Sequence, residues 1–199
     1  MNKKLIALFA TLVASVAVFA QEAKTEQTEQ SAGLIGKSHV DLGFSYLDIK
    51  HTGTDAFGTG LNVNVPVASY LDVGFSYQHS WRESHSTDSV DALSVEATGY
   101  LTQGQFKPFG ALSLGYAWDN GDNHSIWSAD VGVQAALNDQ LAVTVSTGYS
   151  DSFKNGRYGL WDATVGASYD ITKSVSALAE VSYLEYGNFG YSVGIAYKF

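Results

Sequence analysis

The sequence predicts an all-β chain that folds as a single antiparallel up-and-down transmembrane β-barrel of about ten strands. Three observations predict this fold class. From residue 38 onward, large apolar residues alternate with small or polar ones, as in a strand with one apolar and one polar face. The alternating segments are about ten to thirteen residues long, the length at which a tilted strand crosses the hydrocarbon layer. Aromatic residues gather near the segment ends.

The alternation defines each strand in turn. Each segment is expected to turn its apolar face to lipid and its small polar face to the lumen. The expected strands cover residues 38–50, 56–66, 70–82, 90–102, 107–118, 125–137, 141–151, 158–170, 174–185 and 189–199. The apolar residues that define them, in the same order, are Leu42 and Phe44, Leu61 and Val63, Val73 and Phe75, Leu93 and Val95, Leu112 and Leu114, Val131 and Val133, Val143 and Val145, Val165 and Ala167, Ala179 and Val181, and Val193 and Ile195.

An even number of strands places both chain ends on the same side of the membrane, which is expected to be the periplasmic side. Short turns are then predicted there near residues 66–69, 103–106, 138–140 and 171–173. The segments predicted to face outside are also short, and cover residues 51–55, 83–89, 119–124, 152–157 and 186–188.

The aromatic residues support this topology independently. All four tryptophans fall at the outer ends of their strands, namely Trp81, Trp118, Trp127 and Trp161. Other aromatic residues fall at the inner ends, namely Tyr70, Phe106, Tyr169, Tyr197 and Phe199. Indole and phenol rings favour the two membrane interfaces because each has an apolar body and a polar tip. A soluble β-sandwich has no reason to sort tryptophan to one end of its strands.

The last eleven residues are expected to close the cylinder against the first strand. Their apolar face carries Tyr191, Val193, Ile195, Tyr197 and Phe199. A final strand of this kind that ends in Phe resembles that of small bacterial outer-membrane β-barrel proteins of the OmpA-barrel or opacity-porin kind, over residues 38–199. The resemblance implies a bacterial outer-membrane location, with lipid and lipopolysaccharide around the barrel. It also implies that the barrel-assembly machinery reads the C-terminal strand.

The N-terminal residues have the pattern of a cleaved signal peptide. Lys3 and Lys4 precede an uncharged apolar run, and Val18 and Ala20 are small residues before the predicted cleavage site. A membrane-anchor helix is the alternative, but the run is shorter than the roughly 20 residues that a spanning helix needs. The expected organisation is a signal peptide over 1–20, a flexible periplasmic segment over 21–37 and the barrel over 38–199.

Composition excludes several classes of function. The sequence has no cysteine, which removes disulfides, cysteine-ligated metals and thiol catalysis. Without Lys3 and Lys4, the chain has eleven more acidic than basic residues. Nucleic acid is therefore not an expected partner, because its phosphates require a basic surface.

The expected lumen is lined by small residues and by acidic groups at mid-depth, namely Glu96, Asp130, Asp162 and Glu180. No Lys or Arg is expected to point inward at that depth, and Lys198 points inward only near the periplasmic mouth. Such a lumen favours a narrow, cation-preferring, porin-like leak for ions or small polar solutes. The alternative is a closed structural or surface-interaction barrel, in which the acids bond to Ser, Thr, Asn and Gln and the outer loops carry the function.

The outer rim holds His51, His79, His85 and His124 together with several acidic residues. Imidazole and carboxylate groups can bind a metal or activate water, but their spacing matches no metal motif. A hydrolase at the rim is a remote alternative, because the loops are too short to build a substrate cleft. We therefore expect no enzymatic activity, no cofactor and no metal, and the sequence indicates no oligomeric state.

Overall fold

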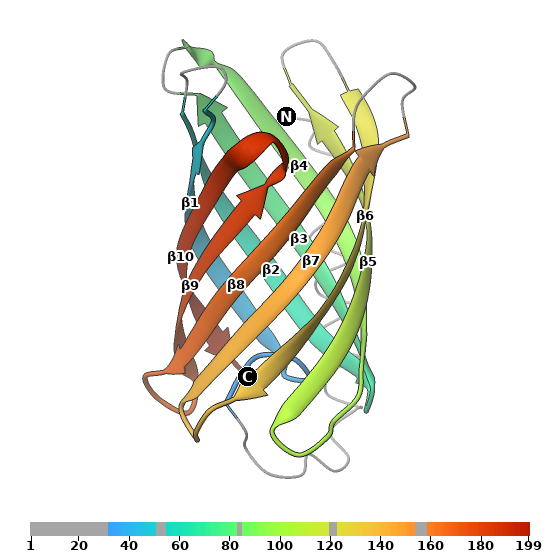
Figure 1. Cartoon of the computed structure of the whole chain (residues 1–199), viewed down its shortest axis with the longest axis vertical. Coiled ribbons are helices and arrows are strands. Elements are labelled where there is room, and N and C mark those ends of the chain that lie inside the picture. The colour runs from blue at the N-terminus through green and yellow to red at the C-terminus, as the bar shows by residue number, and fades with distance from the viewer. Residues whose placement is uncertain (1–31, 51–54, 83–84, 120–122, 154–158) are drawn as a thin grey trace.

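The computed structural model describes residues 32–50, 55–82, 85–119, 123–153 and 159–199, and the predicted signal peptide lies outside them. The chain forms a closed antiparallel barrel of ten strands, in which each strand pairs with its sequence neighbours and β1 pairs with β10 (Figure 1). The predicted fold and strand number are confirmed. The strands are β1 (His39–Asp48), β2 (Ala56–Ala68), β3 (Leu71–Arg82), β4 (His85–Tyr100), β5 (Phe106–Trp118), β6 (Asn123–Ala136), β7 (Leu141–Ser152), β8 (Leu160–Asp170), β9 (Val175–Leu184) and β10 (Asn188–Lys198).

The two ends of the barrel differ in their connections. One end holds the start of β1, the C-terminal Phe199 and the turns after β2, β4, β6 and β8, and we call it the terminal end. It is the lower end in Figure 1, where the C-terminus is marked. The opposite end, which we call the loop end, holds the connections after β1, β3, β5, β7 and β9.

On most strands the side chains alternate between an exposed apolar face and a less exposed face as the sequence predicts, but Phe75 on β3, which was expected to face lipid, is buried. On β5, Leu112 and Leu114 are 66% and 64% exposed, whereas the intervening face carries Ala111 and Ala117, which are buried. The same contrast recurs on β10, where Val193 and Ile195 are exposed and Ala196 is buried. An apolar belt of this kind is compatible with lipid and unfavourable in water.

The seam between β1 and β10 is a continuous antiparallel pairing. It runs from His39 opposite Lys198 to Asp48 opposite Phe189. The backbone nitrogen of Phe199 donates a further hydrogen bond of 3.1 Å to the carbonyl oxygen of Ser38. Pairing of the two terminal strands closes the sheet and leaves no open edge. An open edge would expose unpaired backbone groups, which a membrane does not tolerate.

One predicted connection is wrong. Residues 83–89 were expected to form a loop, but β4 begins at His85, and its pairing with β3 continues to the register Arg82 opposite His85 after an irregularity at Trp81. The sequence of this extension is polar and lacks apolar alternation. A strand that projects beyond a membrane needs no apolar face, so the pattern that marks the other strands is missing here.

The last connection is a short 3₁₀ turn, η1 (Glu185–Gly187), at the loop end. Tyr186 within it has a φ of 67°, which non-glycine residues rarely adopt. Within the described ranges, no helix has both the length and the hydropathy of a membrane span.

The first described residues lie inside the barrel. Residues 32–38 form bends and a turn, and Ala32 and Gly33 are buried. The sequence analysis assigned residues 21–37 to a flexible segment. The structure describes this segment only from residue 32, and there the chain packs against the inner wall at the terminal end.

Candidate functional site

The four predicted lumen acids lie on four strands, β4, β6, β8 and β9. Asp130 of β6 and Asp162 of β8 are both register partners of Gly148 on β7. Glu180 of β9 and Glu96 of β4 likewise have glycines opposite them, which are Gly166 and Gly74. A glycine opposite each carboxylate adds no side chain, and over Gly148 the carboxylate of Asp130 occupies the space that a side chain would fill.

Each of these carboxylates accepts a hydrogen bond from a hydroxyl group two residues away on its own strand. A strand repeats every two residues, so the acid and the hydroxyl share the lumen face. The bonds run from Thr98 to Glu96 at 2.8 Å, from Ser128 to Asp130 at 3.1 Å, from Thr164 to Asp162 at 3.3 Å and from Ser182 to Glu180 at 3.4 Å.

No described Lys or Arg forms an ion pair with these four acids. The four acids on the inner wall therefore have hydroxyl groups, and no described basic side chain, as their partners. A hydroxyl donor stabilises a carboxylate but does not neutralise it.

A cavity of about 280 Å³ lies inside the barrel beside β6 to β10 and β1. Its polar lining includes Asp41, Gln134, Thr144, Ser168, Glu180 and Ser192, and Leu34 of the N-terminal segment also borders it. Glu180 is exposed as a residue although it borders the cavity inside the lumen. A cavity of this size has room for water beside it.

The terminal end of the lumen contains a polar cluster that the sequence analysis did not identify. Asp72 is 2% exposed and accepts a 3.0 Å hydrogen bond from Asn64. Asp41 accepts one of 3.0 Å from Asn62, and its Oδ2 lies 3.5 Å from His39 Nε2. The alternation did place both aspartates on the lumen face. It gave no sign that they would meet other polar groups, because that depends on how the strands are staggered.

Basic residues are also concentrated at this end. Lys37 lies before β1, and burial, followed by the neighbouring ammonium group of Lys198, lowers its pKa to about 8. Lys107 adds to this effect, and Asp170 opposes it. The lumen is thus acidic at mid-depth and carries lysines at the terminal mouth.

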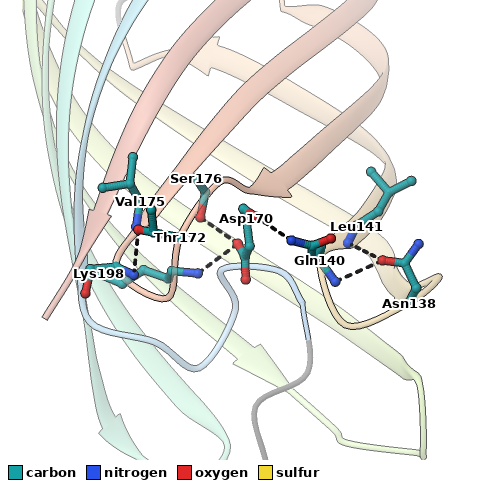
Figure 2. Close-up of polar contacts among 9 residues, drawn as sticks. Asn138, Gln140, Leu141, Asp170, Thr172, Val175, Ser176 and Lys198 are labelled. Atoms are coloured by element: carbon teal, nitrogen blue, oxygen red, sulfur yellow. Dashed lines mark hydrogen bonds and ion pairs between the residues drawn. The ribbon is translucent and has the colours of Figure 1, made fainter.

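Lys198 points inward, as predicted, and forms an ion pair with Asp170, with 2.7 Å between Lys198 Nζ and Asp170 Oδ1. Figure 2 shows this pair and the hydroxyl group of Ser176, which donates a 2.7 Å hydrogen bond to the same carboxylate. The two side chains are 9% and 12% exposed. The pair joins the last residue of β10 to the last residue of β8 at the terminal mouth.

The structure brings together two of the predicted rim residues. His79 Nδ1 lies 2.9 Å from Asp91 Oδ1, and the hydroxyl group of Tyr77 donates a 2.6 Å hydrogen bond to the same oxygen. The position of His51 and the side chain of His85 lie outside the described residues. Among the side chains that are described, no three His, Asp or Glu residues are close enough together to hold a metal ion.

The four tryptophans lie near the loop end of their strands, as the topology predicts. Each contacts another aromatic ring: Trp81 with Phe44, Phe57 and His79, Trp118 with Tyr116, Trp127 with Tyr149, and Trp161 with Tyr183. On β10, the predicted closure residues Tyr191, Val193, Ile195 and Tyr197, with Phe199 after them, are all exposed. The barrel therefore has aromatic groups at both borders of its apolar belt.

No protein-family model and no curated protein matches the sequence. Solved structures do resemble the fold. The translocator domain of the autotransporter NalP from Neisseria meningitidis is similar with a TM-score of 0.50 and 12% identity, over 98% of each chain. An outer-membrane channel from Pseudomonas putida F1 is similar with a TM-score of 0.55 and 8% identity, over 88% of this chain and all of that one. The NanC porin has a TM-score of 0.47 and 13% identity, over 81% of this chain.

At such identities the likeness concerns the fold and not the solute or partner. The structure with the higher TM-score of those named, the channel from Pseudomonas putida F1, is an outer-membrane channel. The chain therefore has the fold of outer-membrane β-barrel proteins.

Proposed function

We propose that this chain is a bacterial outer-membrane protein whose barrel acts as a narrow, cation-preferring leak for ions or small polar solutes. The apolar belt and its aromatic borders support a location in a membrane. The terminal end then faces the periplasm, since both chain ends of a single-chain bacterial barrel lie on that side. The proposed surroundings are lipid and lipopolysaccharide, and the proposal includes no catalytic role.

The observation that carries the proposal is the cavity of about 280 Å³ inside the lumen, which Glu180 borders. A filled barrel would cover this group with side chains, as small eight-stranded barrels do. The cavity instead gives the carboxylate room for water. A hydrated acidic wall attracts cations and repels anions.

The arrangement of charge supports the same preference. Glu96, Asp130 and Asp162 accompany Glu180 at mid-depth, and their hydrogen-bond partners are neutral hydroxyl groups. A cation that passes this level meets carboxylates that no described Lys or Arg neutralises. The ion pair of Lys198 is confined to the terminal mouth.

The test is the conductance of the refolded barrel in a planar bilayer with a salt gradient across it. We expect small conductance steps and a reversal potential of the sign that cation preference gives. The double variant Glu96→Gln and Glu180→Gln should move the reversal potential toward zero. Asp139→Asn is the matched control, because it removes one negative charge from an exposed turn outside the lumen. A reversal potential that is equal in all three proteins would contradict the selectivity.

A closed structural or surface-interaction barrel is the second candidate. The hydroxyl bonds to all four lumen acids favour it, since they satisfy the carboxylates without bulk water. In that case the loop end carries the function. A silent bilayer with folded protein would support the closed barrel and would direct the search to the loops.

A further inference from the structure

The segment from Ala32 to Lys37 is held at the terminal mouth by hydrogen bonds to the barrel wall. The backbone nitrogen of Gly36 donates a 2.8 Å bond to Asp72 Oδ2. The ammonium group of Lys107 donates a 2.8 Å bond to the carbonyl oxygen of Ile35. Asn64 donates a weaker bond of 3.3 Å to the carbonyl oxygen of Lys37.

These contacts show that the segment extends across the lumen and does not run along one wall. Asn64, Asp72 and Lys107 belong to β2, β3 and β5. Gly33 packs against the side chains of Gln134 on β6 and Ala142 on β7. Leu34 borders the cavity whose other lining residues come from β6 to β10 and β1. The segment therefore contacts opposite sides of the barrel and lies between the cavity and the terminal mouth.

Two glycines allow this close approach. Gly33 and Gly36 have φ values of 102° and 81°, in the region that favours glycine. A Cβ atom on Gly36 would lie 2.9 Å from the hydroxyl oxygen of Tyr100, and one on Gly33 would overlap the side chain of Gln134. The segment thus fits the mouth only without side chains at these two positions.

We propose that residues 32–37 form a plug that restricts the terminal mouth and must leave it for solutes to pass freely. This inference rests on the proposed function, since a plug limits flow only where the lumen conducts. Its attachment consists mainly of polar bonds, and water can replace such bonds when the segment leaves. The barrel wall keeps its own pairing in either state, so release of the plug does not require unfolding of a strand.

The first experiment measures whether the segment is docked. The sequence has no cysteine, so Leu34→Cys introduces a single thiol. Its labelling by a water-soluble maleimide should be several-fold slower than in the same chain carrying Gly33→Ala and Gly36→Ala. The control is Gly104→Ala in the Leu34→Cys chain, which adds a methyl group to another glycine with positive φ at the same end, where nothing lies within 4 Å. Equal, fast labelling in all three proteins would overturn the plug.

The second experiment measures the conductance of the wild type, the Gly33→Ala and Gly36→Ala variant, and a deletion of residues 32–37. We expect a several-fold larger conductance in both variants and no change in Gly104→Ala. A conducting wild type with unchanged variants would overturn the plug and leave the proposed leak standing. Silence of all the folded proteins, the deletion included, would overturn the leak and the plug together, even if Leu34→Cys is slow to label.

Discussion

Asp170 at the end of β8 and Lys198 at the end of β10 form an ion pair that passes over β9 at the terminal mouth (Figure 2). Ser176 at the start of β9 donates a hydrogen bond to the same carboxylate, so three consecutive strands meet at one side chain. Both charged groups are largely buried. Removal of one partner leaves the other as an uncompensated buried charge.

Lys198→Met should therefore lower the free energy of unfolding of the barrel by about 3 kcal/mol, and Asp170→Asn by a similar amount. The measurement is denaturant unfolding in lipid vesicles, followed by tryptophan fluorescence. Lys173→Met is the matched control, because Lys173 is an exposed lysine in the turn between β8 and β9, at the same end of the barrel. In a double-mutant cycle, the variant with both Lys198→Met and Asp170→Asn should lose less free energy of unfolding than the sum of the two single losses. Additive losses would contradict a direct interaction.

Gly148 separates the carboxylates of Asp130 and Asp162 on the inner wall. A Cβ atom at this position would overlap the carboxylate of Asp130 and lie 3.0 Å from Asp162 Oδ2. Gly148→Ala should therefore displace the Asp130 carboxylate and destabilise the barrel by about 1 kcal/mol.

Gly60→Ala is the control for this change. It also adds a methyl group to a strand glycine, but the nearest atom is a carbonyl oxygen at 3.8 Å. The gain from a less flexible unfolded chain should make this variant neutral or more stable by about 0.5 kcal/mol. Equal unfolding free energies for the two variants, measured in the same vesicles, would show that the Asp130 carboxylate does not occupy this space.

Docking of the N-terminal segment should strengthen as the pH rises from about 8 to about 10.5. The pKa of Lys37 is about 8 in the docked state, against 10.5 for a free lysine. Between these values the undocked segment binds more protons, so a rise in pH favours docking. The charged groups that act on Lys37 are Lys198, Asp170 and Lys107.

The measurement is the rate at which maleimide labels Leu34→Cys at about pH 7.5 and about pH 9.5. These two pH values lie below and within the range in which docking should strengthen. Each rate is divided by that of the Gly33→Ala and Gly36→Ala background at the same pH, which removes the pH dependence of the thiol itself. The ratio should fall with pH in the otherwise wild-type chain and stay constant after Lys37→Met. A ratio that falls equally in both proteins would assign the pH dependence to another group.

Deletion of Phe199 should reduce the amount of barrel assembled in the outer membrane of cells. The residue is 52% exposed at the terminal end, and its backbone nitrogen bonds to Ser38 across the seam. Phe153→Ala is the control, since Phe153 is an exposed aromatic residue at the loop end. The measurement is the yield of heat-modifiable barrel in membrane fractions. A normal yield from the deletion would contradict recognition of the C-terminal residue.

The alternation of side chains was sufficient to predict the barrel and its strand number. A two-residue period states directly which face a side chain occupies, so Glu96 and Asp130 could be assigned to the lumen without a structure. The extension of β4 to His85 could not be predicted in this way. Its residues are polar throughout, and no hydrophobic period marks a strand outside the membrane.

The polar contacts at the terminal mouth were also beyond the sequence pattern. The bond from Lys107 to Ile35 joins residues 72 positions apart, and depends on how the strands are staggered around the barrel. Residues 32–37 have no alternation, so the pattern that identifies the strands does not place them in the barrel. The signal that was available is the pair Gly33 and Gly36 so close to the first strand, because glycines allow close approach of the backbone.

The plug has a consequence for the order in which the barrel forms. Its partners lie on β2, β3 and β5 to β7, and these strands form a curved inner wall only when they are paired with one another. The chain before β1 can therefore dock only late, after most of the sheet exists. Once docked, it holds the start of β1 beside the position that β10 must reach. The N-terminal segment would thus act as a template for the final strand pairing, and its loss should slow closure of the cylinder more than it lowers the stability of the closed state.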